Sequence, residues 1–223
     1  MNQTPYMMDQ AVSTPVVINR TLRNTYVLLA MSLAVSALAA VWAMKINMQP
    51  MGPLLFLAGA IGGQFLIAAL RNSAWGILAV FAWTAFMGAT LGPIINAYLM
   101  LYSNGAQLVA LAMGGTAAVF FGMSGYALVT KRNLSFLGGM LFAGMIVAFV
   151  AAIANIWLQM TGLSLAISAM SILVFSGFIL YETQQIVRGG TDNYILATVS
   201  LYASIWSIFV HLLNLLGFVS GED

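Results

Sequence analysis

The pattern of hydrophobic and polar positions divides the chain into seven long apolar stretches separated by short polar breaks. Each stretch is about 20 residues or longer, the length that a helix needs to cross the hydrocarbon core of a bilayer. Because the breaks are short, we expect helices that follow one another in sequence to pack as antiparallel neighbours. The predicted membrane-spanning helices are Thr25–Met44, Met51–Leu70, Trp75–Leu99, Gln107–Thr130, Phe136–Leu158, Leu163–Val187 and Tyr194–Phe218.

Composition places the chain among integral membrane proteins of the all-α class. Of its 223 residues, 62% are hydrophobic and 5% are charged, whereas typical soluble domains have about 25% charged residues. So few charges could not cover the surface of a soluble fold. The net charge of +2 is spread over helix ends without a basic patch and gives no indication of a nucleic-acid partner. The chain has no cysteine, which excludes thiol catalysis, disulfides and cysteine-based metal sites.

The basic residues predict which end of each helix faces the cytoplasm. All but Lys45 fall on one side of the membrane, namely Arg20, Arg23, Arg71, Lys131, Arg132 and Arg188. Under the positive-inside rule the N-terminus is cytoplasmic. We expect a cytoplasmic tail at 1–22, a seven-helix membrane domain at 23–218 and a short C-terminal tail at 219–223. Because the last span is the most polar, a re-entrant hairpin with a cytoplasmic C-terminus is the alternative to a full crossing.

Glu182 is the one acidic residue inside an apolar stretch. A carboxylate at membrane depth is costly unless it is solvated or paired, so Glu182 is the first candidate for a functional residue. It precedes Arg188 by six positions, which places it about 9 Å into the membrane. Ser200 lies at a similar depth and Ser204 about 6 Å deeper, so Glu182 can meet either hydroxyl. Arg71 could reach inward by snorkelling and form a cytoplasmic-side lock with Glu182. The alternative is a carboxyl group held by hydroxyls for packing alone.

A polar stripe runs along the last predicted helix. Its members are spaced four, three, four and three positions apart, which puts them on one helix face; they are Ser200, Ser204, Ser207, His211 and Asn214. Lipid offers these side chains no partner, so we expect the stripe to face inward. Two interpretations stay open: hydrogen bonds that hold the bundle together, or the lining of a narrow polar pathway.

The same stripe gives little indication of an enzyme or a metal centre. One histidine with no acid nearby is not a cluster of metal ligands. Ser207 and His211 lie one helical turn apart, so a nucleophile–base dyad is geometrically conceivable. No oxyanion-hole motif accompanies them in the sequence. We therefore expect no catalytic residues, no resident metal and no cofactor.

Small residues recur at helical spacing and predict close packing between helices. A bend is also predicted at Gly92–Pro93, because proline lacks a backbone donor and clashes with the preceding turn. The glycines in question are Gly59, Gly62, Gly63, Gly114, Gly115, Gly122, Gly125, Gly138 and Gly139.

The stretch Gly177–Ile186, in which an aromatic residue, an acid and a threonine follow one another, resembles the helix-six signature of the Bax inhibitor-1 family. The stretch Asn193–Tyr202, with Phe209, resembles the final helix of that family. The resemblance runs from about Arg23 to Phe218. Further stretches match in order and spacing, namely Leu91–Pro93, Gly114–Thr116 and Phe136–Gly139.

The resemblance implies a seven-helix bundle with the last helix at the centre and six helices around it. It also implies a comparison with those family members that are calcium leak channels, whose gate is a hydrogen-bonded pair of acids on helices six and seven. Glu182 matches the first acid. The second falls on Ser204, and the asparagine that usually follows falls on Ser207. A glutamate and a serine cannot share a proton as two carboxylates do, so the sequence departs from that gate, although a simpler gate at Glu182 stays an alternative.

Leu22–Tyr26 and the Asn193–Tyr202 stretch are most similar to a bacterial subgroup of the family, described as modulators of the membrane protease FtsH. This resemblance implies a multi-pass protein of the bacterial inner membrane that binds and restrains FtsH. The lipid bilayer and FtsH are then its partners, and the N-terminal tail Met1–Asn19 is the suspected contact. The alternative is a pH-sensitive calcium or proton leak with Glu182 at its cytoplasmic-side gate and Ca²⁺ as a transported ion.

Overall fold

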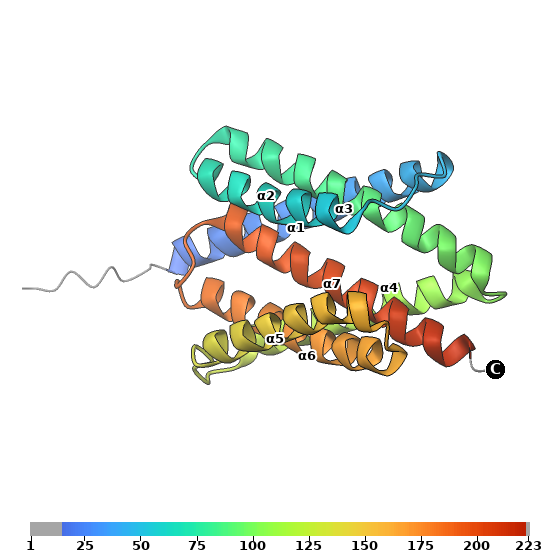
Figure 1. Ribbon diagram of the computed structural model, residues 1–223. Coiled ribbons are helices and arrows are strands. Elements are labelled where there is room, and N and C mark those ends of the chain that lie inside the picture. Colours follow the sequence, from blue (N-terminus) through green and yellow to red (C-terminus); the bar gives the residue numbers. More distant parts are fainter. Residues whose placement is uncertain (1–14, 222–223) are drawn as a thin grey trace, which may run out of the picture.

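The computed structural model describes residues 15–221, and this part of the chain folds into seven α-helices (Figure 1). Each helix is long and apolar enough to cross a membrane, which confirms the predicted all-α, seven-helix class. The helices are α1 (Pro15–Lys45), α2 (Pro53–Leu70), α3 (Ala74–Leu101), α4 (Gly105–Val129), α5 (Leu137–Leu158), α6 (Thr161–Val187) and α7 (Tyr194–Gly221).

Apart from one terminus, every predicted helix end lies within three residues of the observed end. The exception is the start of α1, which begins at Pro15 rather than Thr25. The later part of the predicted N-terminal tail is therefore helical. Residues 1–14, which hold most of the suspected contact Met1–Asn19, lie outside the described residues.

Helix α7 is continuous over 28 residues. At about 1.5 Å per residue it is about 42 Å long, enough to cross a bilayer completely. The alternative of a re-entrant hairpin is therefore wrong. The described part of the chain starts and ends at opposite ends of the bundle (Figure 1).

Helix α7 occupies the centre of the bundle, as the family resemblance implies. Half of its membrane-spanning window is buried, the largest share of the seven helices. It contacts α1, α2, α3, α4 and α6. Helix α5 is the departure from the expected arrangement, because it contacts α6 and does not touch α7. Five helices surround α7, and α5 lies outside them.

Two pairs of consecutive helices do not touch, which corrects the expectation that short loops make neighbours. Helix α1 does not contact α2, and α4 does not contact α5. Helix α1 packs on α3 instead, because two glycines of α3 let the backbones approach closely. A Cβ atom added to Gly88 would collide with the Ser36 carbonyl oxygen, and one added to Gly92 would lie 2.6 Å from Ala43 Cβ. The fit between helix surfaces, rather than the length of the loop, thus decides which helices are neighbours.

The other glycines divide into packing and non-packing positions. Added Cβ atoms at Gly59 and Gly63 would meet the rings of Phe86 and Trp83, and one at Gly138 would meet Tyr181. At Gly115 the nearest atom is Leu212 Cδ1, at 3.2 Å. The prediction of close packing is wrong for a further set, where no atom lies within 4 Å of an added Cβ: Gly62, Gly114, Gly122, Gly125 and Gly139.

Candidate functional site

Glu182 and Ser200 form a hydrogen bond between α6 and α7. The Ser200 hydroxyl donates to Glu182 Oε1 over 2.9 Å, and the Glu182 side chain is partly buried. The helical rise on the two sides of the α6–α7 loop places these residues at the same depth. Ser204, the other hydroxyl expected in reach, instead donates to the Ser200 carbonyl oxygen over 3.0 Å. The carboxylate is thus held by one serine, and the second acid of the leak-channel gate has no counterpart at Ser204.

The predicted lock between Arg71 and Glu182 is not formed. Arg71 is exposed in the α2–α3 loop, and the hydrogen-bond partner of Glu182 in the described residues is Ser200. Helix α2 contacts α3 and α7 but not α6. Arg71 therefore lies at the end of a helix that α7 separates from Glu182.

His211 and Asn214 bind a pair of serines on α6. His211 Nδ1 lies 3.1 Å from Ser168 Oγ. The Asn214 side-chain amide donates to Ser168 Oγ over 2.8 Å and to Ser164 Oγ over 3.1 Å. Because this imidazole nitrogen is engaged with α6, the conceivable dyad with Ser207 is not formed through it. Sequence reasoning missed Ser164 and Ser168, although their spacing of four positions places them on one face of α6.

The polar stripe of α7 therefore divides into two clusters. One contains Glu182, Ser200 and Ser204, and the other contains His211 and Asn214 with their α6 serines. In the described part of the chain no hydrogen bond joins the two clusters. Four of the five stripe residues form hydrogen bonds within α7 or to α6, as expected of polar groups that hold a membrane bundle together. The fifth, Ser207, has no side-chain hydrogen bond among the described residues.

Two further buried hydroxyls, neither of which was predicted from the sequence, join the central helix and α6 to the rest of the bundle. Tyr202 on α7 is 1% exposed. Its hydroxyl lies 2.6 Å from Ser36 Oγ on α1 and 3.3 Å from the Thr84 carbonyl oxygen on α3. Thr183, next to Glu182, lies 3.3 Å from Ser124 Oγ on α4. Buried hydroxyls of this kind fix the relative positions of α1, α3 and α7, and of α4 and α6.

Side-chain to backbone hydrogen bonds join the loops at the predicted cytoplasmic end. The Asn193 amide donates to the Arg71 carbonyl oxygen over 3.0 Å, and its carbonyl oxygen accepts the Ile195 and Leu196 N–H groups at the start of α7. The Gln184 side chain accepts the Leu134 N–H and donates to the Arg132 carbonyl oxygen, each over 2.8 Å. The α2–α3 and α4–α5 loops are thus both attached to the α6–α7 region.

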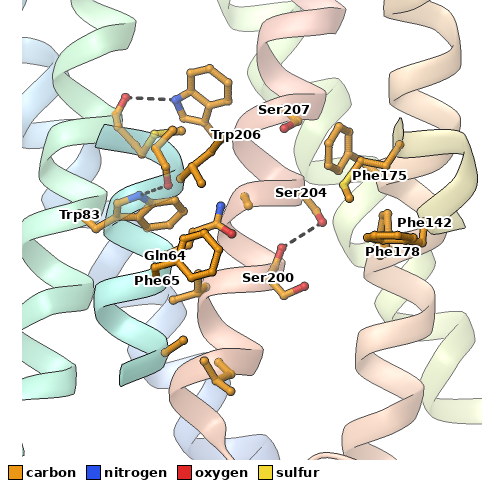
Figure 2. A pocket seen from close by; sticks show the side chains of 18 of the residues that line it. Gln64, Phe65, Trp83, Phe142, Phe175, Phe178, Ser200, Ser204, Trp206 and Ser207 are labelled. Atoms are coloured by element: carbon orange, nitrogen blue, oxygen red, sulfur yellow. Dashed lines mark hydrogen bonds between the residues drawn. The ribbon is translucent and has the colours of Figure 1, made fainter. Parts of the chain in front are cut away.

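A cavity of about 600 Å³ lies beside α7. We call it the α2–α5 cavity, because α2 lines one side and α5 and α6 line the other. Figure 2 shows Gln64 and Phe65 on one side of α7, and Phe142, Phe175 and Phe178 on the other. Ser200, Ser204 and Ser207 of the α7 stripe form its floor. Sequence reasoning did not find this cavity.

A family model described as "Inhibitor of apoptosis-promoting Bax1" matches residues 18–221. The chain belongs to the Bax inhibitor-1 family. The resemblance expected from the helix-six and helix-seven stretches is thereby confirmed.

Two similar proteins come from Escherichia coli strains and one from Pseudomonas aeruginosa. The first is named "Modulator of FtsH protease YccA" and is 48% identical over 204 residues, which cover 92% of each chain. Its counterpart with the same identity and coverage is named "Inner membrane protein YccA". The Pseudomonas protein is 44% identical over 223 residues and covers 100% of both chains. This member of the Bax inhibitor-1 family is therefore a multi-pass inner-membrane protein, and its relatives are named as a modulator and a membrane protein rather than as enzymes.

Proposed function

We propose that this protein binds the membrane protease FtsH and restrains it. The observation that carries the proposal is the identity of 48%, over 92% of both chains, to a protein named a modulator of that protease. The polar contacts fit this role better than a conducting pathway, because they form short links within α7 and between helices and leave two separate clusters.

The start of α1 supports the tail as one point of contact. Helix α1 begins ten residues before the predicted start of the membrane span at Thr25, a distance of about 15 Å along the helix. The same helix packs on α3 and on α7. A partner that holds the tail would therefore be connected through one continuous helix to the centre of the bundle.

The loops at the predicted cytoplasmic end form a second surface suited to a large partner. The exposed Arg188 guanidinium donates to the Lys131 carbonyl oxygen over 2.9 Å and also to that of Arg132. Lys131 and Arg132 are themselves exposed. The surface is thus basic and is held in place by side chains from the end of α6.

The proposal is tested by co-purification of FtsH with the full chain and with a variant that lacks residues 1–14. The deletion ends where α1 begins, so the bundle should fold. We expect the full chain to retain FtsH and the shortened chain to retain at least several-fold less. Thermal unfolding of both chains in detergent is the control for folding. Absence of FtsH from the full-chain preparation contradicts the proposal.

A calcium or proton leak controlled by Glu182 is the second candidate function. The observation that favours it is the position of Ser200, which contacts Glu182 and also lines the α2–α5 cavity. It has less support than the protease partner. Ser204 supplies no second carboxylate, and the hydrogen bonds of the described residues leave the two polar clusters of α7 unconnected.

A further inference from the structure

The α2–α5 cavity lies between the two helices that are least covered by protein. Of the membrane-spanning windows, 6% of α2 and 11% of α5 is buried, against half of α7. Helices α2 and α5 do not contact each other. A cavity with these helices at its two sides faces the bilayer, so its occupant comes from the plane of the membrane.

Two polar side chains in this cavity have no hydrogen-bond partner among the described residues. Gln64 is exposed on α2, six residues before the end of that helix at Leu70, a distance of about 9 Å. Ser207 lies thirteen residues after the start of α7 at Tyr194, about 20 Å into the membrane. Hydrocarbon offers neither side chain a partner. A polar group at membrane depth therefore favours an occupant that carries its own donors and acceptors.

The shape of the cavity favours a helix. Its lining runs from Phe56 to Ala68 on α2 and from Leu196 to Ser207 on α7, which is about 16 to 18 Å, or three helical turns. Aromatic rings line both sides (Figure 2). A lipid tail would fill such a groove but would leave Gln64 and Ser207 without hydrogen bonds, because the polar headgroup stays at the membrane surface. A transmembrane helix that packs one face into the groove can place a polar side chain against each of them.

We propose that one transmembrane helix of FtsH packs one of its faces into the α2–α5 cavity, and that polar side chains of that helix, at different depths, bond to Gln64 and to Ser207. This inference rests on the proposed function and names the membrane surface through which the partner is held. The Ser200 hydroxyl already donates to Glu182 Oε1. The Ser204 hydroxyl already donates to the Ser200 carbonyl oxygen. Gln64 and Ser207 are therefore the groups that the cavity leaves for a partner.

Site-specific photo-crosslinking in vesicles that contain purified FtsH tests the location. A photoreactive phenylalanine analogue is placed at Phe65 on α2 or at Phe142 on α5, which line the cavity. The matched control is Phe121 on α4, which does not line it and is 71% exposed, against 73% for Phe65. We expect adducts to a transmembrane segment of FtsH from Phe65 and Phe142, and none from Phe121.

Several outcomes overturn the proposal. Adducts to lipid alone would mean that the groove holds an acyl chain. Adducts to a second copy of this chain would make it a self-association surface, and equal labelling from Phe121 would mean contact without a specific groove. If FtsH co-purifies but no position in the cavity labels it, the groove proposal fails and the proposed function stands. If FtsH neither co-purifies nor is labelled, both fail.

A second pair of variants tests the polar contact without a photoreactive group. Gln64→Leu removes the amide from the cavity, and Gln107→Leu removes an exposed amide from α4, outside the cavity. Interhelical hydrogen bonds in membranes have modest strength, so we expect FtsH binding to weaken about threefold for Gln64→Leu. Binding should be unchanged for Gln107→Leu. Equal effects of the two substitutions, with unchanged thermal unfolding, would overturn the role of Gln64.

Discussion

The centre of the bundle and its two outer helices are built differently. Helices α1, α3 and α7 meet through close backbone contacts at Gly88 and Gly92 and through the buried hydroxyl of Tyr202. Helix α2 contacts α3 and α7, and α5 contacts α6 alone. Within one apolar chain, the fold thus depends on the central helices, while the two outer helices border the α2–α5 cavity.

The largest expected effect comes from glycine-to-alanine substitutions that compare the two regions. At Gly88 the added methyl group meets the Ser36 backbone, which cannot move aside, so we expect a loss of about 3 kcal/mol in the free energy of unfolding. At Gly63 the added methyl group meets the Trp83 ring beside the cavity, and we expect a loss of about 1 kcal/mol in the free energy of unfolding. Gly62 has no atom within 4 Å, and alanine there should be neutral or slightly stabilising. Unfolding in detergent measures all three, and equal losses would contradict the comparison.

The next effect concerns the buried hydroxyl of the central helix. Tyr202→Phe removes the partner of Ser36 Oγ, and a buried hydroxyl left without a partner costs about 1 to 2 kcal/mol. Tyr126→Phe is the matched control, because Tyr126 is 49% exposed. Its expected change is within about 0.5 kcal/mol. If the two variants unfold with the same free energy, the Tyr202 contact does not stabilise the centre as described.

A smaller effect on the free energy of unfolding is expected at the His211–Asn214 end of the polar stripe of α7. Ser168→Ala removes the serine that both His211 and Asn214 contact, and we expect a loss of about 1 kcal/mol. Ser207→Ala removes a hydroxyl that has no side-chain hydrogen bond among the described residues, so the chain alone should unfold almost unchanged. The same unfolding assay compares them. A larger loss for Ser207→Ala would mean that this serine has a structural role.

The smallest expected effect is that of Glu182→Gln. The amide can still accept from Ser200, so stability should change by less than about 1 kcal/mol. On the account that this protein is a regulator, calcium and proton flux into vesicles between about pH 5 and 8 should equal that of empty vesicles for both proteins. A pH-dependent flux that Glu182→Gln alters would instead establish the leak.

The helices themselves could be predicted because a spanning helix needs a continuous apolar run of fixed length. Ser200 and Ser204 could be predicted as the candidate partners of Glu182, because all three residues lie a known number of positions from one short loop; of the two, Ser200 forms the contact. Helix contacts could not be predicted in the same way. Apolar runs alone do not show that Gly88 meets Ser36 whereas Gly122 meets nothing.

The expectations that failed depended on which helices meet. Arg71 lies at a suitable depth for Glu182, but its helix does not contact α6. Ser168 was missed because the sequence around a serine in an apolar run does not show which residue of another helix it contacts. The α2–α5 cavity arises because two helices that are far apart in sequence do not touch. The pattern of residues within one helix cannot predict such a separation.

The most direct test of the central claim is the rate at which FtsH degrades a membrane-protein substrate in vesicles. The rate is compared with and without this chain at increasing ratios, and an unrelated seven-helix protein serves as the control. We expect the rate to fall several-fold and to reach a plateau as the chain saturates FtsH, with no change for the control protein. A degradation rate that is independent of this chain at saturating ratios would contradict the claim that it binds and restrains FtsH.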